Sequence, residues 1–547
     1  MRLIEPDQRN FDEIYASFRW EIPTHYNIAY EVCDKHRQRS NDIALFYEND
    51  RGDTKSFTFG QIKSLSDRFA NALRALGVSR GDRVAIILSQ RVETGIAHLA
   101  IYKIGAIALP LSILFGHDAL EYRLRDSGAK VVITGTSHSD MLADMKQQLP
   151  DLDVIIGCDD AQGRMGFWPL LEKARDSLQA VNTGADDPAL LIYTSGTTGP
   201  PKGALAAHRS LLGNLPGFEL SQNFFPREDD VFWTPADWAW TGGLMDGLLP
   251  SWYYGRPILA YEGGKFDAER VCHLLEKYKV KNAFIPPTAL KMMRQIPDIS
   301  SRFKLAFRSI MSAGETLGEE LFRWAEDALR VSVNEMWGQT EFNYLVGNCS
   351  EIMPVKPGSM GKPYPGHSIG VIDGEGQPMP IGEPGELAAR IDDPVMFLNY
   401  WGKEEATREK FIGEWFCTGD IGHWDDDGYL WFVGRKDDVI SSAGYRIGPG
   451  EIEDCLLKHA AVAQAAVIGS PDELRGSIVK AFIVLAKSYE PTDELKTDIQ
   501  ASVRTRLAAY EYPREIEFIK EVPMTTTGKV RRMELRQRDL DSKLGRG

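Results

Sequence analysis

Short apolar runs alternate along the chain with longer segments in which apolar residues recur at helical spacing. The run Asp82–Leu88 predicts a buried strand, and the segment after it places Ile96, Leu99 and Ile104 near the spacing of a helix. Further strands are expected at 129–135, 188–194, 256–261, 280–286 and 307–313, and helices at 266–279 and 317–330. Repeated alternation of strand and helix is typical of mostly parallel sheets covered by helices, so we expect an α/β fold.

The pattern changes near residues 429–439, where an apolar strand ends in the charged tetrad Arg435–Asp438. A helical pattern and two strand patterns follow, at 448–459, 464–470 and 479–485. We therefore expect a large N-terminal domain over residues 1–435 and a small C-terminal domain over residues 436–547. A looser break inside the first domain is expected near residues 182–189.

The composition is that of a globular protein, with 43% of the 547 residues hydrophobic and 26% charged. Lys and Arg number 63 and Asp and Glu 78, so the net charge is −15. Such a chain has no overall attraction for nucleic acid or for an anionic membrane. An anionic ligand must therefore be met by local cations and backbone N–H groups. We expect no nucleic-acid partner, and the choice between a monomer and a homo-oligomer stays open.

Cysteine spacing and the length of the apolar stretches bear on cellular location. The six cysteines are scattered without a CxxC or zinc-ligand spacing, which suits reduced thiols better than a disulfide framework. No stretch approaches the roughly 18 continuous apolar residues of a membrane helix, and the N-terminus lacks the apolar core of a signal peptide. We expect a cytoplasmic protein without a membrane span.

One stretch, YTSGTTGPPKGA at 193–204, is unlike a core strand or a helix. It combines permissive backbone, hydroxyl donors and one cation: Gly196, Gly199 and Gly203, then Ser195, Thr197 and Thr198, and Lys202. Glycines permit positive φ and close backbone approach, and successive exposed N–H groups form a trap for anions. The stretch predicts a polyphosphate site, and the alternative is a solvated polar loop.

The stretch is not a Walker A loop, which requires G-x-x-x-x-G-K-[ST]. Two prolines separate Gly199 from Lys202, and a glycine follows the lysine. The G-x-G-x-x-G pattern is also absent from it. Ordinary P-loop and dinucleotide-binding interpretations are therefore disfavoured.

The stretch resembles the phosphate loop of the adenylate-forming, or AMP-binding, superfamily, which includes acyl-CoA synthetases, luciferases and peptide-synthetase adenylation domains. Further motifs of that superfamily follow in order: SAGE (312–315), NEMWGQTE (334–341), TGD (418–420), GRKDD (434–438), SAGYRIGPGEIE (442–453) and PMTTTGKVRR (523–532). The chain is most similar to acetyl- and medium-chain acyl-CoA synthetases. This resemblance implies a large domain of stacked, helix-covered sheets and a small mobile C-terminal α+β domain.

The resemblance implies an ATP-dependent acyl-CoA synthetase with two half-reactions. A small carboxylic acid and ATP give acyl-AMP and pyrophosphate, and acyl-AMP and CoA then give acyl-CoA and AMP. ATP and CoA are the implied substrates and Mg²⁺ the implied cofactor. The acid and ATP are both anionic, so the site must offset their repulsion at the α-phosphate.

The resemblance also assigns residues to the nucleotide. The implied β- and γ-phosphate contacts are Thr194, Ser195, Gly196, Thr197, Thr198, Gly199 and Lys202. The implied adenine-lining residues are Gly314, Glu315, Thr316, Glu335, Met336 and Trp337. Thr340 is implied to bind the α-phosphate, and Glu341 to bind Mg²⁺. Asp420 and Arg435 are implied at the ribose, and Arg446 at a phosphate.

Lys529 is implied to bridge the attacking carboxylate and the α-phosphate, where its charge stabilises the transition state. A lysine there obstructs the thiol of CoA, and the family resolves this by rotating the small domain about a hinge, matched here by Asp437. The rotation brings the Ala443–Gly444 backbone to the pantetheine. Arg504 matches an arginine that contacts a CoA phosphate.

Four residues are implied to line the acyl pocket: Trp240, Thr241, Ala313 and Gly338. Acetate-specific relatives carry a second tryptophan, in WWQTE, where this chain has Gly338 in MWGQTE. Loss of an indole frees volume for several methylenes, each worth about 0.8 kcal/mol when buried. We therefore expect an acid longer than acetate: short branched, medium-chain or small aryl.

Outside their motifs, these residues have ordinary alternatives. Glu341 is then a surface carboxylate, Asp420 a turn residue, Lys529 part of an exposed basic cluster and Trp240 a core aromatic. Two other functions also stay open: an enzyme that loads the phosphopantetheine of a carrier protein, and a non-catalytic nucleotide-binding regulator. The lack of a fused carrier domain in the 547 residues weighs against the first, and the intact motif residues weigh against the second.

Overall fold

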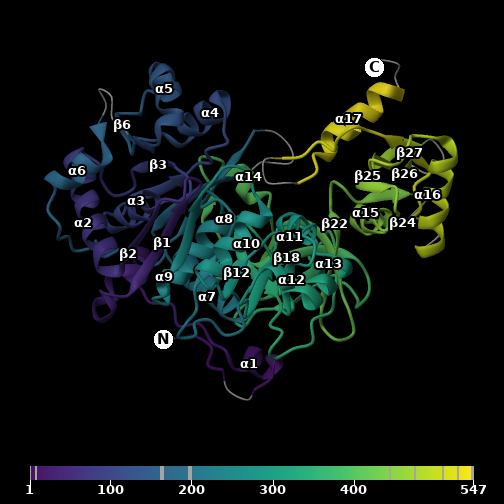
Figure 1. The fold of residues 1–547 in the computed structure, drawn as a ribbon, viewed down its shortest axis with the longest axis horizontal. Coiled ribbons are helices and arrows are strands. Elements are labelled where there is room, and N and C mark those ends of the chain that lie inside the picture. The colour runs from purple at the N-terminus through teal and green to yellow at the C-terminus, as the bar shows by residue number, and fades with distance from the viewer. Residues whose placement is uncertain are drawn as a thin grey trace. The chain divides into compact units, whose positions relative to one another are not determined.

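A computed structural model describes residues 2–6, 9–159, 165–194, 200–442, 445–472, 476–507, 511–525 and 529–543. The chain divides into two compact units (Figure 1). The first comprises Met1–Ser368 and Arg390–Glu414, and the second Ile369–Ala389 and Trp415–Gly547. The expected boundary after residue 435 falls inside the second unit, so the domain limits 1–435 and 436–547 remain a prediction.

One sheet of the first unit has the strand order β19-β9-β8-β4-β3-β5-β6-β7. The strands are β3 (Arg83–Ile87), β4 (Ile107–Pro110), β5 (Val131–Thr134), β6 (Val154–Gly157), β7 (Met165–Gly166), β8 (Pro188–Thr194), β9 (Lys202–Ala207) and β19 (Asn399–Tyr400). Pairing is parallel from β8 to β7. The β8–β9 and β9–β19 pairs are antiparallel.

A second sheet of the first unit runs β16-β15-β14-β13-β12-β10-β11-β1-β2. Its strands are β1 (Ile43–Asn49), β2 (Thr54–Thr58), β10 (Phe232–Trp233), β11 (Ile258–Glu262), β12 (Asn282–Phe284), β13 (Ser309–Ser312), β14 (Val333–Gln339), β15 (Phe342–Gly347) and β16 (Ser359–Pro363). Pairing is parallel from β14 to β1, and antiparallel pairs close both ends.

Helices cover these sheets (Figure 1). The helices of the first unit are α1 (Phe11–Ser17), α2 (Phe59–Ala75), α3 (Val92–Lys103), α4 (His117–Ser127), α5 (Thr136–Met145), α6 (Phe167–Lys173), α7 (Ser210–Ser221), α8 (Thr241–Gly243), α9 (Leu249–Tyr253), α10 (Ala268–Lys277), α11 (Pro287–Arg294), α12 (Ile299–Arg302), α13 (Glu319–Trp324) and α14 (Glu404–Arg408). Short π or 3₁₀ segments are η1 (Tyr30–Asp34), η2 (Arg37–Arg39), η3 (Lys146–Gln148), η4 (Leu244–Leu248) and η5 (Ala325–Leu329).

The strands and helices expected from the apolar pattern are confirmed. The run at 82–88 is β3, and the helical pattern after it is α3, which is buried along its whole length. Alternate residues of β3, Ala85 and Ile87, pack with α4 and α5 in one core. Strands β12 and β13 pack with α10, α11 and α13 in another. Because both sheets are covered by helices, their strands are nearly continuous apolar runs.

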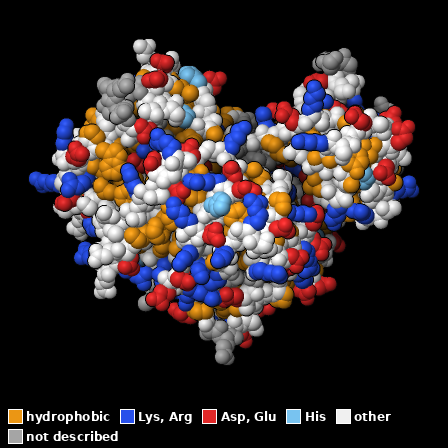
Figure 2. All heavy atoms as spheres, viewed as in Figure 1, with side chains coloured by type: hydrophobic (Ala, Val, Ile, Leu, Met, Phe, Trp, Pro, Cys, Tyr) orange, Lys and Arg blue, Asp and Glu red, His pale blue; other side chains and the backbone are white. Residues whose placement is uncertain are grey.

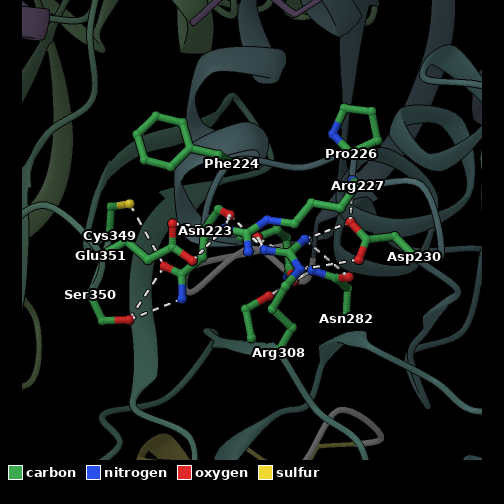
Figure 3. A network of polar contacts seen from close by, with 12 residues as sticks. Asn223, Phe224, Pro226, Arg227, Asp230, Asn282, Arg308, Cys349, Ser350 and Glu351 are labelled. Carbon is green, nitrogen blue, oxygen red and sulfur yellow. Dashed lines mark hydrogen bonds and ion pairs between the residues drawn. The ribbon is translucent and has the colours of Figure 1, made fainter. Parts of the chain in front are cut away.

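A buried polar network lies at the amino-terminal edge of β10, β12 and β13 (Figure 3). Arg308, just before β13, donates to both carboxylate oxygens of Asp230, at 3.1 Å and 2.5 Å. The same guanidinium donates to the carbonyls of Gln222 and Asn223 and to Asn282 Oδ1, at 2.9, 2.6 and 3.3 Å. The side chain of Asp230 is fully buried. We call this set the Arg308 network; it ties the turn after α7 to the sheet.

The second unit contains two groups of strands. Antiparallel strands β17 (Ile369–Ile372), β18 (Gly385–Arg390), β21 (Trp415–Trp424) and β22 (Leu430–Arg435) form one group, whereas β20 (Phe411–Ile412) belongs to the first unit. The other group is β23 (Ile440–Ser442), β24 (Tyr445–Ile447), β25 (Val462–Asp472), β26 (Gly476–Leu485) and β27 (Glu515–Phe518). Helices α15 (Pro449–Leu457) and α16 (Asp493–Arg506) pack in one core, and α17 (Arg532–Lys543) in another.

Surface charge and cysteine state follow the composition. Lys and Arg side chains are interspersed with Asp and Glu over the face in view in Figure 2. All six cysteines are buried, and none of them forms a disulfide in the described chain. None of the helices in the described ranges combines the length and the apolar composition of a membrane span.

Candidate active site

The predicted phosphate loop connects the antiparallel strands β8 and β9. Thr194, the last residue of β8, is the register partner of Lys202, the first residue of β9. Its Oγ1 donates to the Lys202 carbonyl at 3.4 Å. The predicted contacts between them, Ser195, Gly196, Thr197, Thr198 and Gly199, lie outside the described residues.

Gly203 has a different role from the one expected. It lies in β9, and it is not among the described glycines with positive φ. A Cβ at this position would lie 2.8 Å from Leu191 Cδ1 and 3.2 Å from the ring of Tyr193. The glycine is therefore explained by close packing within the hairpin and not by a left-handed backbone.

Glu341 and Lys202 both contact Tyr400 of β19. The Tyr400 hydroxyl donates to Glu341 Oε1 at 2.6 Å, and both residues are buried. The Lys202 ammonium lies 5.3 Å from the centre of the Tyr400 ring, within cation–π distance. The structure thus brings together the predicted metal carboxylate and the predicted phosphate lysine, which are 139 positions apart in the sequence.

The predicted adenine-lining residues come from neighbouring parallel strands. Gly314, Glu315 and Thr316 follow β13, Glu335–Trp337 lie in β14, and Ser312 is the register partner of Glu335. Gly314 has a φ of +91°, which favours glycine. Glu335 is buried and accepts from the Leu317 N–H at 3.2 Å. Ligands of α/β sheets bind beyond the carboxyl ends of parallel strands, which is where these residues lie.

A small cavity adjoins this region. Its walls are mostly apolar and come from β8, β9, the start of α7 and Val395, and they include Thr241 and Thr340. A predicted acyl-pocket residue and a predicted α-phosphate contact therefore line one cavity. Ser210 lines it as well, and the Oγ atom of Ser210 and the Oγ1 atom of Thr241 are buried without a hydrogen-bond partner among the described residues.

A buried carboxyl group supports one wall of this cavity. Asp246 accepts from the side-chain amides of Asn214 and Asn343, and both asparagines line the cavity. Asn343 also donates to Asn214 Oδ1 at 2.9 Å. Burial, with no cation paired to the carboxyl group in the described chain, raises the pKa of Asp246 to about 8.

The structure gives less direct evidence on the other predicted acyl-pocket residues. A Cβ on Gly338 would lie 2.8 Å from the Tyr344 nitrogen and 3.2 Å from the Asn343 Cα, so glycine here lets β14 and β15 approach closely. This gives Gly338 a reason to be glycine that is separate from acyl-chain length. Trp240 packs edge-on against Phe115 at 5.8 Å, and Ala313 is buried after β13. The acyl-pocket roles of Trp240, Ala313 and Gly338 stay predictions.

In the second unit, the predicted ribose contacts pair with each other. Asp420 of β21 and Arg435 of β22 are register partners, and Arg435 Nη1 lies 2.8 Å from Asp420 Oδ1. Thr418 Oγ1 accepts from the Asp420 N–H at 3.0 Å and donates to the Leu387 carbonyl at 2.8 Å. The TGD motif therefore fixes a buried carboxylate at one strand position, which a turn residue would not require.

Lys529 lies at the base of a hairpin and is exposed. Its N–H donates to Thr525 Oγ1 at 3.0 Å, and its carbonyl accepts from the Thr525 N–H at 2.7 Å. No described carboxylate pairs with its ammonium, although Arg531 and Arg532 beside it have acidic partners. Lys529 is thus distinguished from its basic neighbours by being free to meet another anion.

Three further predictions concern the second step. Asp437 follows β22, and its neighbour Asp438 pairs with Arg536 of α17 at 2.6 Å. Arg504, in α16, lies with its guanidinium 5.7 Å from the Tyr512 ring centre. The hinge role of Asp437 and the CoA role of Arg504 stay predictions. Ala443 and Gly444 lie outside the described residues, and for Arg446 the structure describes the backbone, in β24.

The amino-acid sequence matches the AMP-binding enzyme family over residues 33–401 and the AMP-binding enzyme C-terminal domain over residues 451–529. These ranges include the phosphate loop, the Thr340–Glu341 pair and Lys529. The chain belongs to the AMP-binding enzyme family. As a family member it is an AMP-forming acid–thiol ligase, an acyl-CoA synthetase whose substrates are ATP, CoA and a small carboxylic acid.

Three relatives of this AMP-binding enzyme span nearly its whole length. Acetyl-coenzyme A synthetase of Bacillus subtilis (strain 168) is 35% identical, over 98% of this chain and 96% of its own. The mitochondrial acyl-coenzyme A synthetase ACSM3 of Rattus norvegicus is 34% identical, over 97% and 93%. The crystal structure of the anthranilate CoA ligase AuaEII in complex with anthranoyl-AMP is 31% identical, with a TM-score of 0.87 over 95% of this chain and 99% of that one.

Sequence reasoning missed two features of this AMP-binding enzyme. Tyr400 lies in a strand of two residues, and nothing in its neighbourhood relates it to Lys202 or Glu341. The Asp246–Asn214–Asn343 group comes from three elements, and each residue alone reads as an ordinary polar side chain. A polar residue within an apolar helical segment was the available signal for Asn214 and Asp246.

Proposed function

We propose that this synthetase activates a carboxylic acid longer than acetate in a Mg²⁺-dependent reaction. The observation that carries the proposal is the cavity that Thr340 and Thr241 share, because it extends mostly apolar space away from the predicted α-phosphate contact. The name of the Bacillus subtilis relative indicates acetate and that of AuaEII an aryl acid, so the relatives' names leave the acid open.

The proposed nucleotide roles follow the motifs. Lys202 and Thr340 bind phosphate oxygens, Asp420 accepts from the ribose hydroxyls, and Lys529 offsets the negative charge as the carboxylate attacks. A cation without a carboxylate partner is what such an anionic reaction requires. Among the described residues neither Lys202 nor Lys529 has an ion-pair partner, which supports both assignments.

Glu341 fits a Mg²⁺ ligand. Mg²⁺ is usually held by one or two carboxylates together with substrate phosphates, and not by an all-protein cage. Glu341 is a buried carboxylate whose one recorded hydrogen bond within the described chain leaves Oε2 available. The described residues contain no group of three acidic, His or Cys side chains that would form a separate metal cage. The bound metal would neutralise phosphate charge.

An acid panel tests the proposed substrate. Pyrophosphate release should be measured with acetate, butyrate, hexanoate, octanoate and benzoate, with CoA present. We expect kcat/KM to rise about fourfold per added methylene, from the transfer free energy of about 0.8 kcal/mol each, until the cavity is filled. Preference for acetate over every longer acid would overturn the proposal.

A cavity-filling variant sharpens this test. Ala206→Leu adds volume to the cavity wall and should move the preferred acid towards shorter chains. Leu205→Met is the matched control, because Leu205 faces the opposite side of β9 and packs in the core with α4 and α5. An identical chain-length profile for both variants would show that the acyl chain lies elsewhere.

The location and the acceptor remain to be tested as well. The cytoplasmic location expected from the sequence is a proposal that cell fractionation of the source organism checks. Transfer of the acyl group to free CoA supports the synthetase reaction. Transfer only to a carrier-protein phosphopantetheine would favour the first alternative function.

A further inference from the structure

The segment around Tyr400 connects two functional elements of the first unit. The Tyr400 side chain contacts Glu341 through its hydroxyl at 2.6 Å and Lys202 through its ring at 5.3 Å. These contacts use different parts of one side chain, the phenol oxygen and the π-face. Tyr400 itself is 3% exposed, so its position is fixed by packing.

Backbone hydrogen bonds hold the segment to both elements. The N–H groups of Leu398 and Trp401 donate to the carbonyls of Leu205 and Gly203 in β9, each at 2.7 Å. The Phe397 N–H donates to the Glu341 carbonyl, also at 2.7 Å. Residues 397–401 therefore bind the backbone of the lysine strand and the backbone of Glu341 together. The tyrosine is at the centre of this connection.

The charge arrangement is unusual because Lys202 and Glu341 share a neighbour and do not pair with each other. No ion pair joins them within the described chain, and neither has another charged partner there. Opposite charges attract more strongly when they are partly buried than when they are surrounded by water. The Tyr400 ring offers the ammonium a cation–π contact, and the Tyr400 hydroxyl occupies one oxygen of the carboxylate.

We propose that Tyr400 is a positioning residue that keeps Lys202 and Glu341 apart. It leaves Glu341 Oε2 for Mg²⁺ and the Lys202 ammonium for phosphate oxygens. This inference rests on the proposed function, since it uses the metal role of Glu341 and the phosphate role of Lys202. It adds a residue that belongs to none of the sequence motifs, and a physical reason why those two groups stay available.

Two substitutions separate the two contacts. Tyr400→Phe removes the hydroxyl and keeps the ring, whereas Tyr400→Leu removes both. Binding of ATP should be measured by calorimetry in excess Mg²⁺ and, separately, in excess EDTA, without acid or CoA. Hydrogen bonds to charged groups are worth about 1.5–3 kcal/mol, so Tyr400→Phe should weaken MgATP binding by about 10-fold or more. Metal-free ATP binding should stay within about twofold of the wild type, a change of about 0.4 kcal/mol.

Tyr400→Leu should weaken the binding of both MgATP and metal-free ATP. Without the ring, Lys202 moves to Glu341, and neither group is then available to the nucleotide or its metal. Equal weakening of both forms by Tyr400→Phe would overturn the proposal, since the hydroxyl would then not act through the metal carboxylate. Unchanged MgATP binding by Tyr400→Phe would overturn it as well.

Tyr278→Phe is the matched control. The Tyr278 hydroxyl also donates to a buried carboxylate, Glu48, at 2.9 Å, although Glu48 is paired with Arg270 and Lys277 as well, and Tyr278 belongs to none of the motifs. Its loss should leave both binding measurements unchanged. The midpoint temperature of thermal unfolding should change little in both Tyr278→Phe and Tyr400→Phe. A loss of MgATP binding in Tyr400→Phe alone then reflects the position of the hydroxyl and not the stability of the fold.

Glu341→Gln, alone and combined with Tyr400→Phe, distinguishes failure of this inference from failure of the proposed function. Glu341→Gln alone should abolish the advantage of Mg²⁺ over EDTA. If it does not, Glu341 is not the metal ligand and the proposed function is wrong at that point. If it does, adding Tyr400→Phe should cause no further loss, because the hydroxyl acts only through Glu341. Additive losses would overturn the role of Tyr400 and leave the metal ligand intact.

Discussion

Replacement of Asp230 by asparagine should strongly destabilise the first unit while leaving its chemistry intact. Both oxygens of Asp230 accept from Arg308, and Oδ2 also accepts from the Arg227 N–H at 2.7 Å. Whichever way the new amide turns, its NH₂ group faces an N–H donor. The Arg308 guanidinium, 15% exposed, then lacks its anionic partner (Figure 3).

The expected loss is large because the pair is buried. Removing one member of a buried ion pair costs about 3–5 kcal/mol, since an uncompensated charge remains. The three carbonyl oxygens that also accept from Arg308 retain part of its hydrogen bonding and place the estimate nearer the lower value. Asp229→Asn is the matched control, because the adjacent Asp229 is 72% exposed and pairs with Lys281 at the surface. That change should cost less than about 1 kcal/mol.

Equilibrium urea unfolding followed by tryptophan fluorescence gives both free-energy changes. Turnover of the folded Asp230→Asn variant should match the wild type, because the Arg308 network lies at the amino-terminal strand edge and the motif residues lie towards the carboxyl ends. Equal destabilisation by the two substitutions would refute the reasoning from burial. A large fall in turnover without a fall in stability would refute the assignment of the network to structure alone.

Three further predictions concern the site. Lys529→Ala should slow acyl-AMP formation by about 10²–10³-fold yet leave thioester formation from supplied acyl-AMP largely intact, and single-turnover assays that show equal losses would contradict it. Asp420→Asn should raise the KM for ATP by about 10–100-fold, because one charged acceptor is lost, and an unchanged KM in pyrophosphate-release kinetics would exclude a ribose contact. Asp246→Asn should flatten the pH dependence of stability. The folded-state pKa of about 8 exceeds the unfolded value of 3.8, so wild-type stability falls as pH rises between them, by up to about 1.4 kcal/mol per unit. Urea unfolding at pH 5.5, 6.5 and 7.5 should show that slope in the difference between wild type and variant, and a constant difference would refute it.

Strand and helix positions followed from the sequence where the periodicity was continuous. Strands such as β3 and β13 are short apolar runs that one window of residues reveals. The parallel order also followed, because strand and helix alternate. Pairing between distant segments did not follow: β9 lies between β8 and β19, and the latter is two residues almost 200 positions away. A strand of two residues at a sheet edge is too short to show a recognisable pattern of apolar and polar residues.

In the candidate site, too, some residues followed from the sequence and others did not. Motifs name residues that recur in a family, and these include Lys202, Glu341 and Asp420. Motifs do not show which residues support them. The contact of Tyr400 with two of these groups depends on tertiary structure alone. At Gly338 the size argument from sequence stays a prediction, and the structure adds a second reason for glycine, the close approach of β15.

Detection of acyl-AMP is the decisive test of the two-step synthetase reaction. The wild-type chain should be incubated with ATP, Mg²⁺ and the preferred acid without CoA, and the products identified by mass spectrometry. Enzyme-bound acyl-AMP and pyrophosphate should form in equal amounts, and added CoA should convert the adenylate to acyl-CoA and AMP. Acyl-CoA formation with ADP and phosphate as products, or without any acyl-AMP, would contradict it.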